Sequence, residues 1–351
     1  MISTIISIII GLLILSVIII AHELGHFITA KISKVRVEEF GLGFPPRLIS
    51  FKKGETRYSL NAIPFGGFNK LAGEEDPSLP GSLAGKSIGT RLWVISAGSL
   101  ANLFLPIFLF SIAFMVPHDF VSGQVLIEEV VPDSPAAQSG IEAGDVFVSI
   151  NGQLLHNSAE LNRQIYLNLG KEVAILVKHP DSTTEEVRLI PRWKTVSVGI
   201  KYTTSDYTIT REHYPFWLAI PMGARECIET LILYKNGIIG MIIGAFPAQV
   251  AGPVGIAQIT GEVAKAGLNP LLELSGFISI ALGITNLFPL PALDGGRIVF
   301  VLLEAIRRGK RVSPKIEALV HFIGFVLLMA VLLVITYQDI VRIISGESLI
   351  P

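Results

Sequence analysis

The sequence has little charge and almost no cysteine. Of its 351 residues, 16% are charged, 50% are hydrophobic and one, Cys227, is a cysteine. A single cysteine excludes an internal disulfide and any metal or redox site built on two thiols. The net charge of -1, without a long basic or acidic tail, indicates no nucleic-acid partner.

The uncharged residues form long runs, which together with a mean hydropathy of +0.59 indicate a membrane protein. The first run, 1–21, is long enough to cross a hydrocarbon core at about 1.5 Å per residue. It lacks a basic start and a small-residue cleavage site, so we expect it to stay on the mature protein. Uncharged runs at 92–117, 274–293 and 322–338 predict three further spans.

His22, Glu23 and His26 stand where the first uncharged run ends, in the pattern H-E-x-x-H. On a helix the two imidazoles lie on one face and can bind one metal ion, with the glutamate beside them. Short patterns of this kind also arise by chance, but ionisable groups at membrane depth are costly and usually functional. We therefore predict a zinc site with Glu23 as general base, which takes a proton from a water activated by the metal.

A catalytic zinc usually has a third protein ligand, often a carboxylate, and Asp294 is the best-placed candidate. It follows the uncharged run 274–293, and prolines and glycines on both sides of it predict a broken helix. The plainer alternative is a kinked packing helix with a capping aspartate.

The distribution of basic residues predicts how the spans are oriented. The stretch 31–91 holds ten Lys and Arg residues, which places it in the cytoplasm. A second basic loop follows the run 274–293, so Asp294 should lie at the depth of His22. The run 236–261 carries six glycines and two prolines, and a crossing there would put Asp294 on the wrong side.

Two segments near these spans offer further polar or turn-forming residues. Residues 57–68 predict short strands after a turn-rich break at 41–46, either as a surface hairpin or as a hairpin entering the membrane. In the second span, Gly98, Ala101 and Asn102 form a small face for close helix packing. The Asn102 amide suits either packing or the active site.

Residues 123–191 have a soluble composition and predict a small folded domain. Ser134 and Pro135 are typical of a helix start, Asn151-Gly152 of a tight turn, and Asn157 with Glu160 of a second helix start. The run from Val131 to Asp145, followed by Ile150-Asn151-Gly152, is similar to PDZ domains of bacterial proteases. Such a domain is either a clamp for a chain end or strand, or a size filter without a ligand.

Taken together, these motifs resemble the site-2 protease family of intramembrane zinc metallopeptidases, in its bacterial PDZ-containing, regulator of sigma-E protease form. The resemblance rests on the H-E-x-x-H pattern and, in order, on segments 61–68, 97–102, 252–257 and 286–296. It implies zinc bound by His22, His26 and Asp294, with Glu23 as the base. It also implies that substrate is held by Asn286, Gly66 and Gly67, with Asn102 as a further candidate.

The family implies an enzyme of the cell inner membrane that cleaves peptide bonds within or near membrane-spanning segments. Expected partners are the lipid bilayer and single-span membrane proteins, such as anti-sigma factors or signal-peptide remnants, and no nucleic acid. The PDZ-like domain is expected to be extracytoplasmic.

The predicted fold class is an α-helical polytopic membrane protein with about four transmembrane helices, an inserted α+β PDZ-like domain and a membrane-associated β-hairpin. The predicted units are a first span (1–30), a cytoplasmic loop with the hairpin (31–91), a second span (92–117), the PDZ-like domain (122–195), amphipathic or interfacial helices (213–262), a broken span (274–304) and a last span (318–340).

Two other functional classes compete with the protease. An inactive scaffold would use the zinc only to hold the bundle, but such a site needs no base, so Glu23 favours the enzyme. A metal transporter is disfavoured because the candidate ligands lie at one depth and form no pathway.

Overall fold

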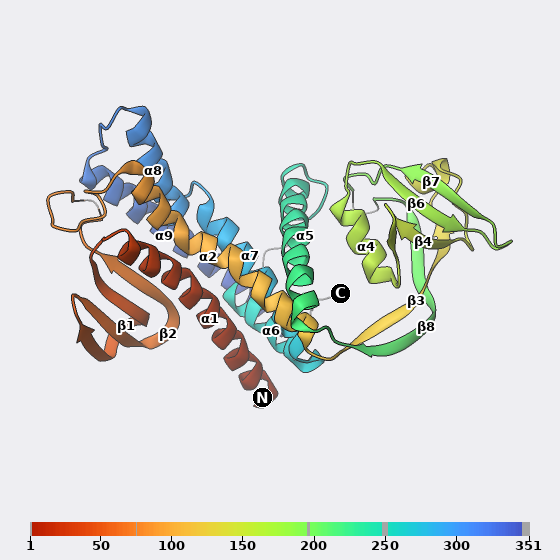
Figure 1. The fold of residues 1–351 in the computed structure, drawn as a ribbon, viewed down its shortest axis with the longest axis horizontal. Coiled ribbons are helices and arrows are strands. Elements are labelled where there is room, and N and C mark those ends of the chain that lie inside the picture. The colour runs from red at the N-terminus through yellow and green to blue at the C-terminus, as the bar shows by residue number, and fades with distance from the viewer. Residues whose placement is uncertain (1, 75, 195–196, 248–251, 346–351) are drawn as a thin grey trace. The chain divides into compact units, whose positions relative to one another are not determined.

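The computed structural model describes residues 2–74, 76–194, 197–247 and 252–345. They form two compact units, one made of residues 1–113 with 250–351 and the other of 114–249, and Figure 1 shows the elements of each. The predicted boundaries at residues 1 and 195 lie outside the described residues. The first unit contains α1 (Ile2–Ile32), β1 (Val37–Lys53), β2 (Thr56–Leu71), α2 (Ile88–Met115), α6 (Pro253–Ala266), α7 (Leu268–Leu287), α8 (Asp294–Ile306) and α9 (Pro314–Ile344).

Among the described residues, four helices of this unit are long and apolar enough to cross a membrane, which agrees with the predicted number of spans. They comprise Ile9–Ile32 within α1, and the whole of α2, α7 and α9. The break predicted within 286–296 is observed at 288–293, between α7 and α8. Pro289 and Pro291 cannot continue a regular helix, so the chain turns there, and the two glycines follow in the first turn of α8.

The short helix α6 packs along α1 rather than forming a fifth long helix. At Gly11 of α1 an added Cβ would lie 3.2 Å from the Ala257 Cα, so a glycine permits this close approach. At the start of α6 the Gly255 N–H donates to the Asp339 carboxylate of α9 over 2.8 Å. A buried carboxylate at a helix N-terminus satisfies free N–H groups and is favoured by the helix dipole. The predicted segment 213–262 therefore holds two helices with different neighbours.

A buried ion pair joins the start of α2 to the end of α8. The Arg91 guanidinium donates to the Glu304 carboxylate, and both side chains are less than a tenth exposed. Arg311 also binds Glu304 at 3.1 Å and donates to the Ala84 carbonyl at 2.6 Å. Since each charge has its partners, this network fixes α8 relative to α2 and the loop before it.

The predicted short strands 57–68 are part of one long strand, β2, which pairs with β1. The predicted break at 41–46 also lies inside a strand, β1. Its pairing shifts register repeatedly there, and Gly43 adopts a φ of 76°. The Gly-Pro run therefore bends the strand, as bulges do, instead of ending it.

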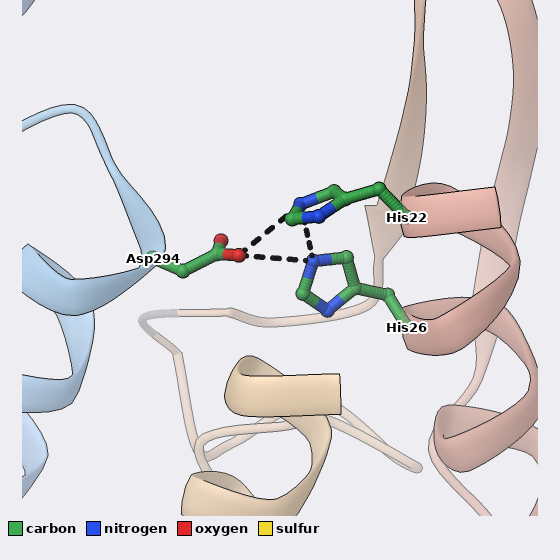
Figure 2. Close-up of side chains that lie close together, drawn as sticks. All are labelled: His22, His26 and Asp294. Atoms are coloured by element: carbon green, nitrogen blue, oxygen red, sulfur yellow. Dashed lines mark hydrogen bonds and ion pairs between the residues drawn. The ribbon is translucent and has the colours of Figure 1, made fainter. Parts of the chain in front are cut away.

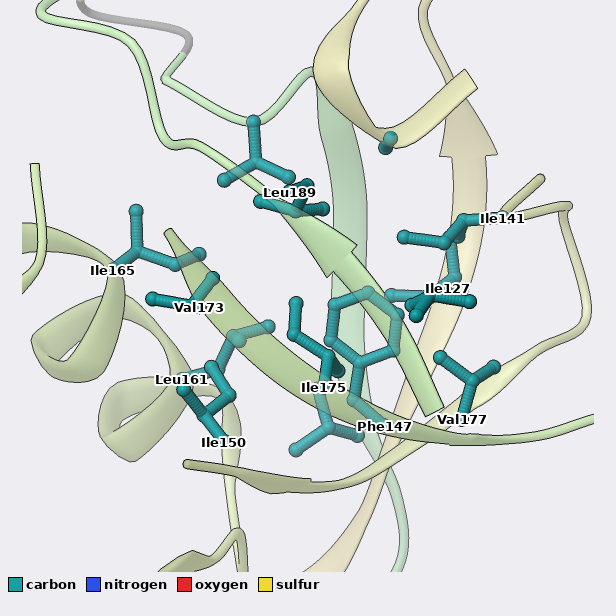
Figure 3. Close-up of a cluster of buried hydrophobic side chains, with 14 of the residues drawn as sticks. Ile127, Ile141, Phe147, Ile150, Leu161, Ile165, Val173, Ile175, Val177 and Leu189 are labelled. Carbon is teal, nitrogen blue, oxygen red and sulfur yellow. The ribbon is translucent and has the colours of Figure 1, made fainter. Parts of the chain in front are cut away.

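The second unit is the inserted domain, followed by a long helix. It contains β3 (His118–Val130), α3 (Pro135–Gln138), β4 (Val146–Ile150), β5 (Gln153–Leu154), α4 (Ser158–Leu167), β6 (Val173–Lys178), β7 (Thr184–Leu189), β8 (Ile200–Glu212) and α5 (Phe216–Ile242). The antiparallel sheet has the order β7-β6-β4-β3-β8, with β5 paired to β4. Alternate inward residues of the sheet, such as Phe147, and residues of α4, such as Leu161, build the core in Figure 3.

The predicted helix starts of this domain are confirmed, and its sheet continues beyond residue 195. The Ser134 hydroxyl accepts from the Ala137 N–H, and the Asn157 side chain accepts from the Glu160 N–H. Strand β8 lies beyond residue 195 and pairs with β3 along almost its whole length, from His118 to Val130. Its partner strand is distant in sequence, which is why local pattern did not reveal it.

We expect a pH-dependent contribution of His179 to the stability of the inserted domain. Its Nδ1 lies 2.7 Å from Oδ1 of the buried Asp145, and this hydrogen bond raises the pKa of His179 above its usual value. The stabilisation is therefore complete below about pH 6.5, the pKa in the unfolded chain, and is lost as pH rises through the folded pKa. His179→Ala should reduce hydrogen-exchange protection of β4 and β6 more at pH 5.5 than at pH 9, after correction for intrinsic exchange.

His213→Ala provides the matched control for that experiment, because His213 is exposed and lies outside the sheet. It should leave the protection of β4 and β6 unchanged at both pH values. Equal losses in His179→Ala at pH 5.5 and pH 9 would contradict the linkage.

Candidate metal centre

The two histidines lie on α1 where this helix crosses α2 at close range. The contact between the two helices leaves no space for a side chain at two glycines. A Cβ at Gly25 would collide with the Ala97 carbonyl, and a Cβ at Gly98 would collide with the His26 ring. The His26 Nδ1 is 2.8 Å from the Val94 carbonyl, which can only accept, so the ring donates from Nδ1. Its Nε2 is thereby left with a free lone pair, as a metal ligand requires.

Asp294 reaches the histidines from the turn between α7 and α8. It is the first residue of α8, and the following glycines allow the turn to fold against the helix. A Cβ at Gly295 would collide with the Phe288 carbonyl, and one at Gly296 with that of Leu290. The glycine pair is therefore required by a close backbone approach.

The three side chains converge on one point, as Figure 2 shows. The Nε2 atoms of His22 and His26 are 3.2 Å apart, and Asp294 Oδ2 is 3.2 Å from each. Oδ2 is buried and has no hydrogen bond within the described residues. A carboxylate oxygen and the His26 Nε2 both present lone pairs here, and a bound cation would offset their repulsion.

The spacing of these atoms fits zinc. In a tetrahedral site with ligand bonds of about 2.0–2.2 Å, neighbouring ligand atoms are about 3.3–3.6 Å apart, close to the separations of 3.2 Å found here. Two imidazoles with one carboxylate form a usual set for a catalytic zinc, which keeps its fourth position open. In the part of the chain that the structure describes, these three residues form the one group of histidines and carboxylates with metal-binding spacing.

Glu23 lies between the ligands in sequence and is held by the hairpin. The Asn69 side-chain amide donates to the Glu23 carboxylate at 2.7 Å and to the Glu23 carbonyl at 2.6 Å. A Cβ at Gly67 would lie 3.1 Å from the Glu23 Cγ. Strand β2 thus packs directly on the predicted base, and a larger residue than glycine at position 67 would push it away.

The other predicted substrate residues lie at different places. Gly66 precedes Gly67 in β2 and has a φ of 94°, a region that favours glycine. Asn286 is half-buried in the last turn of α7, and Asn102 is fully buried on α2, where its carbonyl accepts from Ser279 of α7. Within the described residues no hydrogen bond or ion pair connects either asparagine to the three ligands. Peptide contact by Asn102 remains a prediction and would require α2 and α7 to separate.

Two residues near the centre were missed in the sequence. Asn69 is a polar residue two positions after Gly67, and strand alternation could have placed both on one face. His321 of α9 accepts from the Ala292 N–H at 3.0 Å and so fixes the turn just before Asp294. An ionisable group in an apolar helix was the available signal for His321.

Comparisons with known proteins agree with this geometry. The model of peptidase family M50 matches residues 10–331. The chain belongs to peptidase family M50. Membership in family M50 makes the chain a protease and confirms its resemblance to the site-2 proteases.

Relatives of the chain match over nearly their full length. A Clostridium perfringens protein named as a candidate zinc metalloprotease is 37% identical over 95% of this chain and 98% of its own. The zinc metalloprotease RasP of Geobacillus kaustophilus is 29% identical, over 97% and 99%. The regulator of sigma-W protease RasP of Bacillus subtilis is 27% identical, over 95% and 97%. Zinc is the expected cofactor for this member of family M50.

We predict that purified protein binds one zinc ion per chain, and that His22→Ala and Asp294→Ala each lose most of it. Removal of either side chain leaves two ligands, too few for a stable catalytic site. Metal analysis of the detergent-purified protein measures this directly. His118→Ala, with its histidine in the inserted domain, should keep its zinc, and full zinc in both ligand variants would show that the site is elsewhere.

Proposed function

We propose that this protein is an intramembrane zinc metalloprotease that hydrolyses peptide bonds within or near the membrane-spanning segments of other proteins. The observation that carries the proposal is the convergence of His22, His26 and Asp294 at apolar helices. A zinc protease that acts on substrates in water does not need long apolar helices around its metal ligands. Two ligands carried by a long apolar helix and a third that follows the break after another support chemistry at membrane depth.

In this proposal each polar group of the centre has one task. His22, His26 and Asp294 would hold a zinc ion, which would supply a Lewis acid for the scissile carbonyl and for a water whose pKa it would lower to about 7. Glu23 accepts the proton of the attacking water and then returns it to the leaving amine. The Val94 carbonyl keeps His26 in the tautomer that presents Nε2.

The hairpin is proposed to receive the substrate as an added strand. Residues 67–71 of β2 pair with β1 along one edge and have no second strand partner within the described residues. Gly67 brings this strand against Glu23. A substrate helix must unwind before its carbonyl is accessible, and pairing with β2 would replace the helical hydrogen bonds that it loses. Asn286 is proposed to bind the substrate backbone.

The inserted domain is proposed to be an extracytoplasmic PDZ domain that acts as a clamp or a size filter. Its sheet, its two capped helices and the motif from Val131 to Asp145 support this assignment. The proposed substrates are single-span proteins of the inner membrane, such as anti-sigma factors or signal-peptide remnants. The Bacillus subtilis relative is named a regulator of sigma-W protease, which is in line with the former.

The chemical proposal predicts that Glu23→Gln retains zinc and fold but loses nearly all cleavage. The amide can still bind water, but it cannot accept a proton. General acid-base assistance is worth about 10²- to 10⁴-fold, and here it activates the only nucleophile. Cleavage of single-span substrates by purified enzyme, with zinc analysis, tests this, and Glu55→Gln at the hairpin tip should behave as the parent. Cleavage above about a tenth of the parent rate would exclude this base.

The topology predicts that a cysteine at Ser182, in the inserted domain, is labelled from outside intact cells, whereas one at Lys53, in the hairpin, is not. Both variants are made in a Cys227→Ala background. The basic loop 31–91 should remain in the cytoplasm. Labelling of both positions after the cells are opened is the control, and labelling at Lys53 in intact cells would overturn the orientation.

A further inference from the structure

Asn69 makes two hydrogen bonds to the predicted base from a separate element of the fold. It lies in β2, paired with Phe40 of β1, and its amide nitrogen is 2.7 Å from Glu23 Oε2 and 2.6 Å from the Glu23 carbonyl. An amide carries two N–H groups, one for each acceptor. The reversed amide would bring its oxygen against two other oxygens, so the surroundings determine its orientation.

The strand is arranged so that this contact can form. Gly67 and Asn69 are two residues apart and therefore face the same side of β2. A Cβ at Gly67 would be 3.1 Å from the Glu23 Cγ. The absence of a side chain at position 67 lets the strand approach α1 closely enough for the Asn69 amide to reach the carboxylate.

An asparagine at this place does not serve packing alone. The Asn69 Oδ1 atom is buried and has no hydrogen-bond partner within the described residues. Such an unpaired oxygen destabilises a folded protein, and an apolar residue of similar shape would not incur that cost. The N–H groups directed at Glu23 are what an apolar residue could not provide.

We propose that Asn69 is a positioning residue that fixes the Glu23 carboxylate beside the metal ligands and couples it to the hairpin. This inference rests on the proposed role of Glu23. A glutamate side chain on a helix has several rotamers, and two donors on one amide restrict it to one. The donors belong to β2. The same strand would therefore hold both the paired peptide and the base that acts on that peptide.

The test compares Asn69 with another asparagine of the same strand. Asn61 also donates from its amide to two oxygens, the carbonyls of Leu42 at 3.2 Å and Gly43 at 3.0 Å, but it holds the hairpin rather than the base. Asn69→Ala should lower kcat about 10- to 100-fold, with KM, zinc content and hairpin hydrogen exchange unchanged. Asn61→Ala should instead increase hairpin exchange and raise KM.

Conservative variants of Asn69 show whether its amide positions the Glu23 carboxylate or whether its side chain only fills space. Asn69→Gln keeps the amide and should recover part of kcat. Asn69→Asp has the same shape but sets a carboxylate against the two Glu23 oxygens, so its kcat should fall below that of Asn69→Ala. If Asn69→Asp retained the parent kcat, shape alone would suffice and the inference would be wrong.

Combination with Glu23→Gln distinguishes this inference from the proposed function. In single-turnover assays Asn69→Ala should reduce cleavage in the parent and cause no further loss in the Glu23→Gln background. If Glu23→Gln is active, the proposed mechanism fails. If Glu23→Gln is inactive while Asn69→Ala keeps the parent kcat, or loses kcat only together with zinc or hairpin protection, the positioning role alone fails.

Discussion

The centre depends on how closely α1 and α2 approach each other. Glycines at positions 25 and 98 remove the side chains that would otherwise separate the helices. Only at this distance can the His26 ring donate to the Val94 carbonyl, a group that belongs to the backbone of α2. A main-chain acceptor cannot change its rotamer, so the tautomer of His26 follows from the helix crossing itself. By permitting this close packing, the two glycines determine which nitrogen of His26 carries the proton.

The third ligand depends on an interruption in a helix. The turn between α7 and α8 places Asp294 at a helix start, and the glycines after it let carbonyls of the turn lie against α8. Helix α9 supports this turn through His321, and an added Cβ at Gly324 would collide with Pro291. Broken backbone is tolerated among apolar helices only where protein surrounds it, and α9 provides that surrounding.

The sequence predicted the spans and the convergence of His22, His26 and Asp294 better than it predicted the strands. Hydrophobic runs and the H-E-x-x-H pattern are local, and the positive-inside rule was enough to place Asp294 at the depth of His22. The pairing of β8 with β3 joins residues far apart in the chain, and a bent strand such as β1 carries turn residues in its interior. Asn69 was missed because its role depends on which helix its strand packs against, which no local pattern states.

Several buried polar atoms of the first unit have no hydrogen bond, and some of them lie at the centre. Among the described residues, His22 Nδ1, Asp294 Oδ2 and Asn69 Oδ1 are buried without hydrogen bonds, and all three belong to the centre or contact it. Gln258 Oε1 on α6 and Arg342 Nε on α9 are also buried without hydrogen bonds, so this feature is shared by the centre and other places. The charges of Arg91, Glu304 and Asp339, by contrast, are buried with partners. The charges that join the helices are therefore paired within the fold, whereas hydrogen-bonding capacity is left open where a cation and a peptide are proposed to bind. That contrast is expected when a site is shaped by its chemistry rather than by stability.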